Sequence, residues 1–330
     1  MEYRILGRTG VRVSAIGLGC GGFGGIGSDP SLFGKGESEE EAFALMDRAA
    51  ELGINYFDTA NTYGGGRSEE TIGRWMRDRG SRDRIVLSTK VFNPTGPDIN
   101  AGGLSRRNVM RAIDASLRRL QTDRIDLYMA HEVDPLTDIA ETMGAFDDLI
   151  RAGKVLYVGF CNIEPRQVED SLATSERNHK AQLVAVQNEY NLLHRAAEAE
   201  MLPLLASKGK SFVAFSPMAG GWLSGKYREG TPAPEGSRMT LRPEPYAGLQ
   251  NPATYQAIER FRAASSSFGV SMGALALAWA ASHHDVTSVL AGPRNLDQFK
   301  AIDEALQVSL GDDDRKRIAE QMAGQVESRA

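Results

Sequence analysis

Short apolar runs alternate along the chain with longer amphipathic segments. Between the runs, apolar residues recur at helical spacing, and the clearest helix begins with the capping box Ser38–Glu41 and ends at Gly53. Eight runs have the continuous apolar character of strands covered on both faces; they span residues 11–19, 54–60, 84–91, 124–131, 154–162, 183–191, 211–218 and 286–292. Further helices are expected after Ser68 and Ser105 and around 138–151, 165–174, 195–208, 254–268, 271–282, 295–306 and 312–323.

Eight strand–helix units with short connections predict an α/β fold, a closed (β/α)8 TIM barrel forming a single domain over residues 1–330. The alternative is a doubly wound sheet, because GLGCGG at 17–22 matches G-x-G-x-x-G directly after a strand. A true dinucleotide fingerprint must open a helix, so that the phosphate meets the helix N-terminus. Here a glycine-rich loop continues to residue 37. We therefore interpret the match as a false one.

Composition excludes several classes of partner. The 330 residues are 42% hydrophobic and 25% charged, with a formal charge of −5, so there is no broad basic surface for nucleic acid or an anionic membrane. The N-terminus lacks the apolar core of a signal peptide, and no run reaches the ~18 apolar residues of a membrane span. Two distant cysteines fit reduced thiols in a cytoplasmic protein. The cysteines and five histidines show no metal-ligand spacing, so no metal is predicted.

Ionisable side chains gather where the predicted strands end. The second run ends in Asp58, with Tyr63 in the loop after it, the third ends in Lys90 and the fourth in His131. Each residue alone has an ordinary structural explanation, such as a turn cap or a satisfied core histidine. In a barrel, however, chemistry lies at the carboxyl ends of the strands. The convergence of four such groups from three adjacent units predicts an active site.

The chemistry of these four groups suits proton donation. Asp58 can pair with Lys90, and the ammonium can polarise the phenol of Tyr63. A neighbouring cation is expected to lower the phenol pKa from its ordinary value of ~10, and a general acid works better as its pKa approaches the working pH. His131 can hydrogen-bond a reacting oxygen. The set predicts that Tyr63 protonates a carbonyl oxygen as a hydride reaches the carbon.

With DTANTY at 58–63, LSTK at 87–90 and DLYMAH at 126–131, the chain resembles an aldo-keto reductase. The resemblance runs from about residue 3 to about residue 306. It implies a (β/α)8 barrel with a short N-terminal β-hairpin and long cofactor and substrate loops. It also implies the catalytic roles of the four residues above and extended binding of NADPH across the top of the barrel.

The resemblance further implies the contacts at the nicotinamide end of the cofactor. Cys161, Asn162 and Gln187 would hold the carboxamide, and Phe215 would stack on the nicotinamide ring and fix its face. The complete predicted cofactor set is Gly19, Cys20, Asp58, Cys161, Asn162, Gln187, Phe215, Ser216, Pro217, Met218, Gly220, Leu223, Lys226, Arg238, Gly292, Arg294 and Gln298.

At the phosphate end, Lys226 in the loop 220–227 would meet the pyrophosphate. The Gly/Pro-rich segment 228–252, which carries Arg238, would form a lid. Arg294 would grip the 2′-phosphate, with Gln298 near the adenine. Relatives often have Glu-Asn where this chain has Ala301-Ile302. Arg294 favours NADPH, and the departure at Ala301-Ile302 keeps NADH as the alternative.

The predicted function is NADPH-dependent reduction of small aldehydes or ketones, or the reverse oxidation of alcohols or sugars. Two alternatives stay open: an NAD(P)-dependent sugar dehydrogenase, and a non-catalytic nucleotide-binding subunit resembling channel β-subunits. Phe23 in the loop 21–37 would form the substrate wall with Tyr63 and His131. The charged last helix is expected to pack loosely or fray. The sequence does not predict an oligomeric state or a specific substrate.

Overall fold

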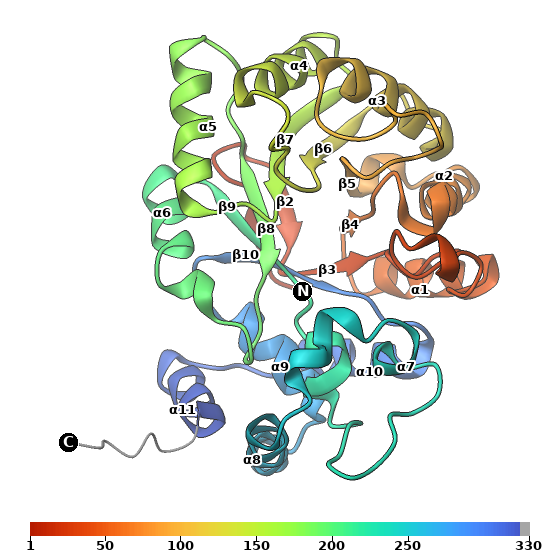
Figure 1. Cartoon of the computed structure of the whole chain (residues 1–330). Coiled ribbons are helices and arrows are strands. Elements are labelled where there is room, and N and C mark those ends of the chain that lie inside the picture. The colour runs from red at the N-terminus through yellow and green to blue at the C-terminus, as the bar shows by residue number, and fades with distance from the viewer. Residues whose placement is uncertain (324–330) are drawn as a thin grey trace.

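The computed structural model describes residues 1–323 and forms a closed barrel (Figure 1). The strands pair in chain order, and the last closes against the first through Val289 and Ile16. The eight parallel strands are β3 (Ile16–Gly19), β4 (Tyr56–Asp58), β5 (Val86–Val91), β6 (Ile125–Ala130), β7 (Val155–Cys161), β8 (Ala185–Glu189), β9 (Ser211–Phe215) and β10 (Val286–Ala291). The predicted fold is confirmed.

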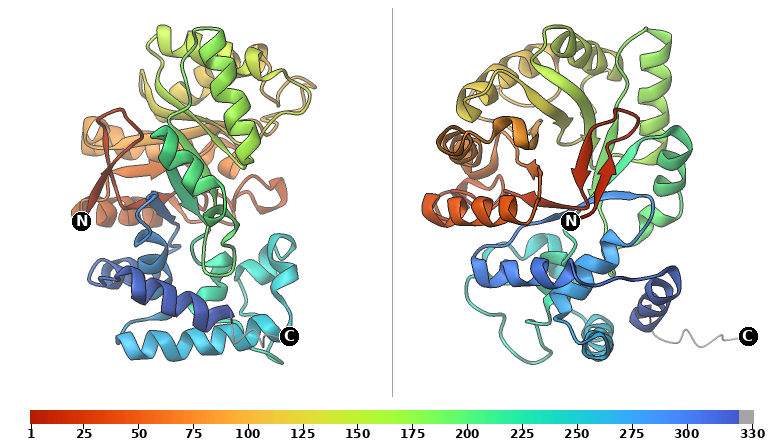
Figure 2. Two further views of the ribbon diagram at one scale, coloured as in Figure 1. Left: turned by 90° about the vertical axis from the view of Figure 1, so that its left-hand side faces the viewer. Right: turned by 180° about the vertical axis from the view of Figure 1, so that it is seen from behind.

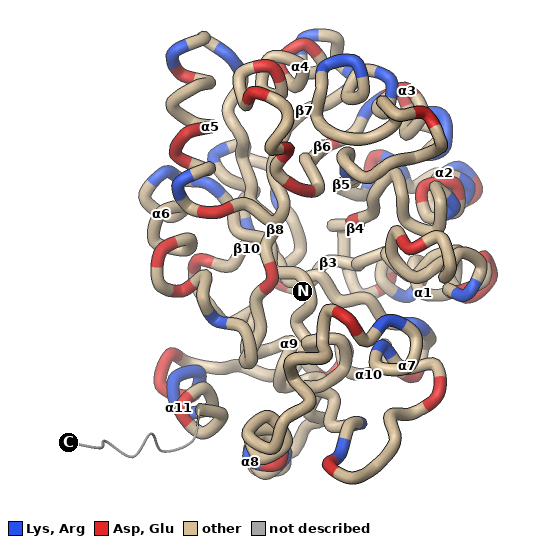
Figure 3. The backbone as a smooth tube through the Cα atoms, viewed as in Figure 1, with Lys and Arg blue, Asp and Glu red and all other residues tan. Residues whose placement is uncertain are grey.

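Helices surround the barrel and carry most of the charged positions (Figures 1 and 3). Those that follow the strands are α1 (Glu39–Glu51), α2 (Arg67–Arg79), α3 (Arg106–Leu120), α4 (Ile139–Arg151), α5 (Pro165–Arg177), α6 (Met201–Lys208), α9 (Met272–Ala281) and α10 (Leu296–Ala305). The additional helices are α7 (Arg238–Leu241), α8 (Pro252–Phe268) and α11 (Asp312–Ala323). Within residues 1–323, no single helix is long and apolar enough to cross a membrane, and α8 and α9 satisfy that test only as a pair bent by 87°.

Two of the three capping predictions are confirmed. Ser38 and Glu41 form the capping box of α1, and Ser105 also caps α3. Ser68 does not cap α2, because that helix begins at Arg67. The Ser68 hydroxyl instead donates to the carbonyl of Cys20, 2.8 Å away, and lies 2.8 Å from the hydroxyl of Thr59. It thereby ties the ends of β3 and β4 to α2.

The predicted strand over 11–19 is two strands. β2 (Arg12–Ser14) pairs antiparallel with β1 (Tyr3–Ile5), and β3 enters the barrel after a break at Ala15, whose N–H donates to the carbonyl of Glu2. The right panel of Figure 2 shows this hairpin lying across the end of the barrel that faces away in Figure 1. Val13 is buried with the inner core, so the hairpin closes this end.

Two apolar clusters form the core. The larger lies between strands and helices, and the smaller fills the barrel. Side chains alternate along a strand, so Val86 on β5 points inward, whereas Leu87 points outward. The inner cluster consists of Leu6, Val13, Tyr56, Val86, Leu127, Met129, Cys161, Ala185, Val213 and Leu290.

The prediction that the last helix frays is wrong for α11. Arg315 is buried, donates to the carbonyl of Trp279 at 2.8 Å and pairs with Glu198 at 2.7 Å. Its guanidinium carbon lies 4.1 Å from the centre of the Trp279 ring. Ile318 and Met322 are also buried, so α11 packs one face against the protein although its sequence is highly charged. The end of the predicted region, 324–330, lies outside the described residues.

Candidate active site

The strand alternation that fills the barrel also brings the predicted catalytic residues together. Asp58 lies two residues after the inward-facing Tyr56, and Gln187 lies two residues after Ala185. Lys90 and His131 also point into the barrel. Lys90 is paired in register with the inward-facing Met129, and His131 lies two residues after Met129. These side chains form the layer at the carboxyl ends of the strands, where barrel enzymes hold their active sites.

Lys90 is the centre of the cluster. Its side chain is fully buried, and Nζ donates to Asp58 Oδ2 at 2.5 Å and to the carbonyl of Thr59 at 2.8 Å. Burial by itself lowers the lysine pKa, but Asp58 opposes it, and the net pKa lies above its ordinary value. Lys90 therefore stays an ammonium ion, and its Nζ lies 5.2 Å from the centre of the Tyr63 ring.

The loop after β4 depends on glycine to place Tyr63. Gly64, Gly65 and Gly66 have φ values of 60°, 71° and 96°, in the left-handed region that glycine adopts without strain. A Cβ on Gly64 would lie 2.8 Å from the carbonyl oxygen of Phe23. The three glycines thus let the tyrosine loop pack closely beneath the loop 21–37.

Tyr63 and His131 face each other across the mouth of the barrel. The Tyr63 hydroxyl lies 3.5 Å from His131 Nε2, and the rings meet edge to face at 5.6 Å. Asn93 Nδ2 lies 3.5 Å from the other ring nitrogen, Nδ1. Burial, reinforced by Lys90, lowers the pKa of His131 to about 3. The imidazole is therefore neutral at ordinary pH and available to hydrogen-bond an uncharged oxygen.

The expected lowering of the Tyr63 pKa is not observed. Burial of the phenol raises the pKa of Tyr63 above its ordinary value, although Lys90 acts in the opposite direction. Desolvation disfavours the phenolate more than the single ammonium favours it. Tyr63 is thus protonated at neutral pH, the state that a proton donor requires.

The predicted nicotinamide contacts lie next to this cluster but are unequally accessible. Gln187 is 3% exposed, its amide donates to Asp58 Oδ1 at 2.9 Å, and its Oε1 lies 3.6 Å from the thiol of Cys161. Asn162 is exposed and donates to the carbonyl of His131 at 3.0 Å. Asp58 therefore accepts hydrogen bonds from two sides, and Asn162 is the member of this set with open access.

Backbone strain marks the ends of two strands on this face. Asn162 follows β7 with φ 51°, and Ser216 and Ala219 follow β9 with φ 55° and 46°. Non-glycine residues rarely adopt this region, and such outliers cluster at functional sites. Phe215 and Met218 are partly accessible beside them, whereas Pro217 is buried.

Several predicted contacts are covered by the protein in this conformation. Cys20 and Leu223 are fully buried, so neither could reach a ligand in this conformation. Phe23 is 1% exposed and packs in the outer core, because the loop folds back through a bridge between Phe23 and Glu37. The structure therefore does not support the predicted substrate-wall role of Phe23, and only loop movement would expose it.

The glycines of the predicted set sit where chain segments cross. Gly19 ends β3 beside Gly292, which follows β10. Gly220 packs under Tyr246, since a Cβ there would lie 2.5 Å from the ring. The segment 228–252, predicted as a lid, thus covers the turn after β9 with short helical turns.

Three cations lie together over the other side of the mouth. Lys226 is exposed, and Arg238 and Arg294 are partly buried. Partial burial and neighbouring positive charge lower the pKa values of Lys226 and Arg238. Within residues 1–323, neither Lys226 nor Arg238 makes an ion pair, and Arg294 pairs with Glu37 at 2.9 Å. Three positive charges against one negative charge suit a ligand with several negative charges, as a phosphorylated dinucleotide has.

At the predicted adenine end of the cofactor site, Ala301 and Ile302 lie in a packed region. Gln298 is exposed, and its Oε1 accepts from the Arg294 N–H at 3.1 Å. Ile302 is buried in the outer core, and Ala301 lies against Gly273. Positions 301 and 302 therefore contribute apolar packing and offer no polar side chain to an adenine.

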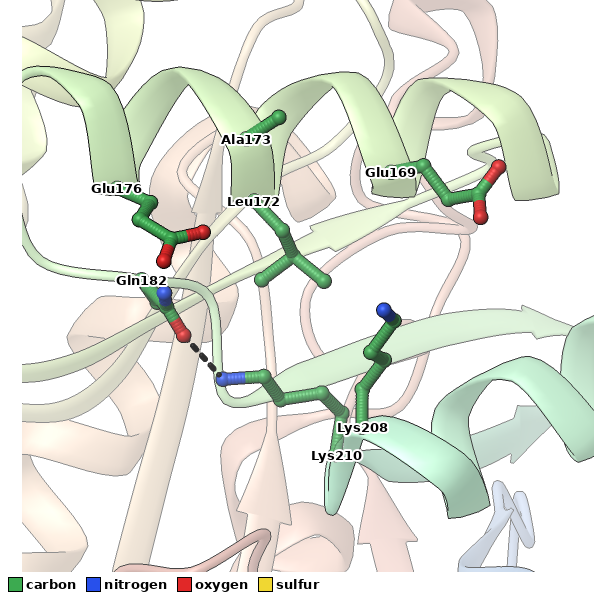
Figure 4. Close-up of a pocket in the computed structure, with 7 residues that line it drawn as sticks. All are labelled: Glu169, Leu172, Ala173, Glu176, Gln182, Lys208 and Lys210. Atoms are coloured by element: carbon green, nitrogen blue, oxygen red, sulfur yellow. Dashed lines mark hydrogen bonds between the residues drawn. The ribbon is translucent and has the colours of Figure 1, made fainter.

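Two further features lie away from the mouth of the barrel. Figure 4 shows a pocket between α5 and α6, lined by Glu169, Leu172, Ala173, Glu176, Gln182, Lys208 and Lys210. None of these is a predicted site residue, so the pocket is separate from the active site. After α9, the ligand-type atoms of His283, His284 and Asp285 lie within 4.8 Å of one another. The absence of a metal stays a prediction.

Comparison with known proteins assigns the family. The model of the aldo/keto reductase family matches residues 15–322. The chain belongs to the aldo/keto reductase family. It is 38% identical to the uncharacterized oxidoreductase YrpG of Bacillus subtilis, over 94% of this chain and 92% of that protein.

Other similar family members have different roles in their names. A probable voltage-gated potassium channel subunit beta of Oryza sativa is 35% identical, over 93% of this chain and 92% of its own length. The L-glyceraldehyde 3-phosphate reductase of Escherichia coli is 32% identical, over 93% of this chain and 88% of its own length. Membership of the aldo/keto reductase family groups this chain with oxidoreductases, and some proteins of similar sequence are named as channel subunits.

Two residues of the site were missed from the sequence. Glu37 pairs with Arg294, and Asn93 lies against His131. Asn93 follows the strand end at Val91, so a wider search of that loop would have found it. Glu37 stands close to the acidic run Glu39–Glu41 that begins α1, and nothing in its local sequence marks it as the buried acid.

Proposed function

We propose that this chain reduces small aldehydes or ketones with NADPH, with Tyr63 as the proton donor. The observation that carries the proposal is the contact of Lys90 with Asp58 and with the Tyr63 ring, beside His131. The surplus of positive charge at Lys226, Arg238 and Arg294 supports a cofactor with a 2′-phosphate. When bound, the nicotinamide supplies the hydride.

Each residue has a distinct part in the proposed reaction. The neutral imidazole of His131 and the hydroxyl of Tyr63 both hydrogen-bond the carbonyl oxygen, which holds the carbonyl group in place. Tyr63 then transfers its proton to that oxygen as negative charge develops on it. The buried ammonium of Lys90 stabilises the resulting phenolate, because it acts in a low-dielectric, preorganised site. Asp58 and the Thr59 carbonyl fix the position of Lys90.

Similarity to channel subunits supports a second candidate, a nucleotide-binding regulatory protein that turns over slowly or not at all. Sugar oxidation with NADP⁺ or NAD⁺ is the reverse reaction at the same residues. Turnover separates the regulatory protein from the two enzymes, because a regulatory protein binds nucleotide without consuming it at a useful rate. The two enzymes differ in the direction of the reaction and in their substrates.

The test is NADPH oxidation with a panel of aldehydes, ketones and sugars, for the parent and for Tyr63→Phe. We expect turnover in the parent and a loss of at least ~10²-fold in the variant, with NADPH binding nearly unchanged, because only the proton donor is removed. Full turnover by Tyr63→Phe would exclude the assigned role. Tight NADPH binding without turnover, in either direction, would favour the regulatory candidate.

A further inference from the structure

The glycine-rich loop 21–37 buries one carboxylate beneath itself. The Glu37 N–H donates to the carbonyl of Gly22 at 2.9 Å, and the Gly24 N–H donates to the carbonyl of Glu37 at 3.0 Å. A Cβ on Gly22 would lie 1.9 Å from Glu37 Oε2, so the loop closes directly over the carboxylate. The Glu37 side chain is 2% exposed. A buried carboxylate needs a charged or hydrogen-bonding partner.

That partner is Arg294. Its Nε donates to Glu37 Oε1 at 2.9 Å, and Nη1 donates to the carbonyl of Gly236 at 2.8 Å. Nη2 lies 3.4 Å from the carbonyl of Lys35. One guanidinium thus connects the loop 21–37, the segment 228–252 and the loop after β10. Since a guanidinium has five N–H donors, part of its hydrogen-bonding capacity stays free for a ligand.

The middle of the same loop contacts the loop that carries Tyr63. The Gly64 N–H donates to the carbonyl of Gly27 at 2.9 Å, and the hydroxyls of Ser28 and Thr62 lie 2.7 Å apart. The loop 21–37 therefore contacts both Arg294 and the loop that carries Tyr63. A substitution that removes the Glu37 contact without keeping its shape would disturb both contacts.

We infer that Glu37 is a positioning residue that restrains Arg294 and weakens its hold on a 2′-phosphate. The inference rests on the NADPH preference in the proposed function. Glu37 satisfies the Nε edge of Arg294 and offsets one of the three positive charges of the cluster. The carboxylate thereby reduces the attraction of Arg294 for an incoming phosphate dianion, and this reduction is strong because the pair is shielded from water. Glu37 thereby lowers affinity for the phosphorylated cofactor and favours its release.

Binding of two matched nucleotides tests the inference without any turnover. Adenosine 2′,5′-bisphosphate carries the 2′-phosphate, and 5′-AMP lacks it. By isothermal titration calorimetry, we expect Glu37→Gln to bind the bisphosphate about five- to tenfold more tightly than the parent, with 5′-AMP unchanged, because the charge of Arg294 is no longer offset by a neighbouring carboxylate. Glutamine keeps the shape and can still accept from Nε.

Two further variants make the result specific. Glu37→Asp keeps the charge and should not bind the bisphosphate more tightly than the parent does. In an Arg294→Ala background, Glu37→Gln should have little effect, because the two residues act through one another. Unfolding curves establish that each variant is folded; if Glu37→Gln does not fold, Glu37→Met with the same ligands replaces it, since it also removes the charge at similar length.

The outcomes separate this inference from the proposed reaction. Unchanged or weaker bisphosphate binding by Glu37→Gln, an equal change for 5′-AMP, or an effect that persists without Arg294 would overturn it. A parent that binds both nucleotides equally would also overturn it. Tighter bisphosphate binding in a protein that reduces no carbonyl compound would support the inference and contradict the reaction.

Discussion

Two polar regions meet at the mouth of the barrel, and they are built in opposite ways. Around Lys90, each charge has its partner inside the protein: Asp58 accepts from the ammonium and from Gln187, and the whole group is buried. Around Lys226 and Arg238, positive charge exceeds negative charge, and the side chains reach solvent. The charges of the first region are balanced within the protein, whereas the second region keeps an excess of positive charge until an anion binds.

The difference follows from where the residues are attached. The catalytic cluster stands on strand ends, where register and alternation fix each side chain to a narrow range of positions. The cationic cluster stands on long loops, which can adjust around a ligand. We therefore expect substitutions in the first region to affect chemistry and stability together, whereas substitutions of Lys226 and Arg238, which make no ion pair within residues 1–323, should affect ligand binding alone.

Lys90→Met is expected to have the largest effect. It leaves Asp58 buried without its cation, which typically costs about 3–5 kcal/mol of stability, and turnover should fall by at least ~10³-fold as phenolate stabilisation is lost. Urea unfolding and steady-state kinetics measure both. Lys226→Met is the matched control, since it should weaken nucleotide binding and leave stability within about 0.5 kcal/mol of the parent. Equal stability of the two variants would refute the comparison.

Arg294→Ala should distinguish NADPH from NADH, and it should also lower stability, because it leaves the buried Glu37 carboxylate without its cation. We expect the dissociation constant for NADPH to rise about tenfold or more, while that for NADH changes little, because a bidentate contact to the extra phosphate is lost. Quenching of protein fluorescence by each nucleotide provides the two constants. An equal loss for both nucleotides would mean that Arg294 does not recognise the 2′-phosphate.

Salt should separate the two regions without any substitution. Raising ionic strength from about 0.05 to about 0.5 M should weaken NADPH binding several-fold, since partly exposed charges are screened, whereas buried pairs are screened much less. Turnover at saturating NADPH should stay nearly constant. A proportional loss of both would show that the buried cluster is as open to solvent as the loops.

The smallest expected effect concerns pH and His131. Its pKa of about 3 lies below the ordinary value of ~6.5, so the unfolded chain takes up this proton first as the pH falls. The contribution of the neutral imidazole to stability is therefore fully present above about pH 6.5 and is lost progressively from there toward pH 3. In urea unfolding between pH 7 and pH 4.5, His131→Gln should lose less stability than the parent. Parallel curves would contradict a neutral buried imidazole.

The sequence predicted those features that depend on local pattern. Strand periodicity gave the barrel and the positions of Asp58, Lys90 and His131, because both follow from which residue ends each strand. Features that depend on distant contacts were missed. The break at Ala15 arises from pairing with β1, and the anchoring of α11 arises because Arg315 meets Trp279 and Glu198.

Electrostatics was the least predictable part of the site. The expected lowering of the Tyr63 pKa considered Lys90 but not the larger effect of burial. The pair of Glu37 with Arg294 joins residues at opposite ends of the chain, and burial of that carboxylate depends on how the loop 21–37 folds back. A sequence motif predicts neither the pKa of Tyr63 nor the burial of the Glu37 carboxylate, because both depend on how much protein surrounds the group.

The pairing of Ile16 with Val289 has a consequence for biosynthesis. Until β10 leaves the ribosome, the growing chain can form only an open sheet with two bare edges, a state prone to non-native association. Gly19 and Gly292 lie on either side of the closing seam. If both contact the cofactor as predicted, nucleotide cannot guide the early steps of folding. It can only bind a chain that has already closed, and by mass action it would then draw newly made molecules out of the vulnerable open state.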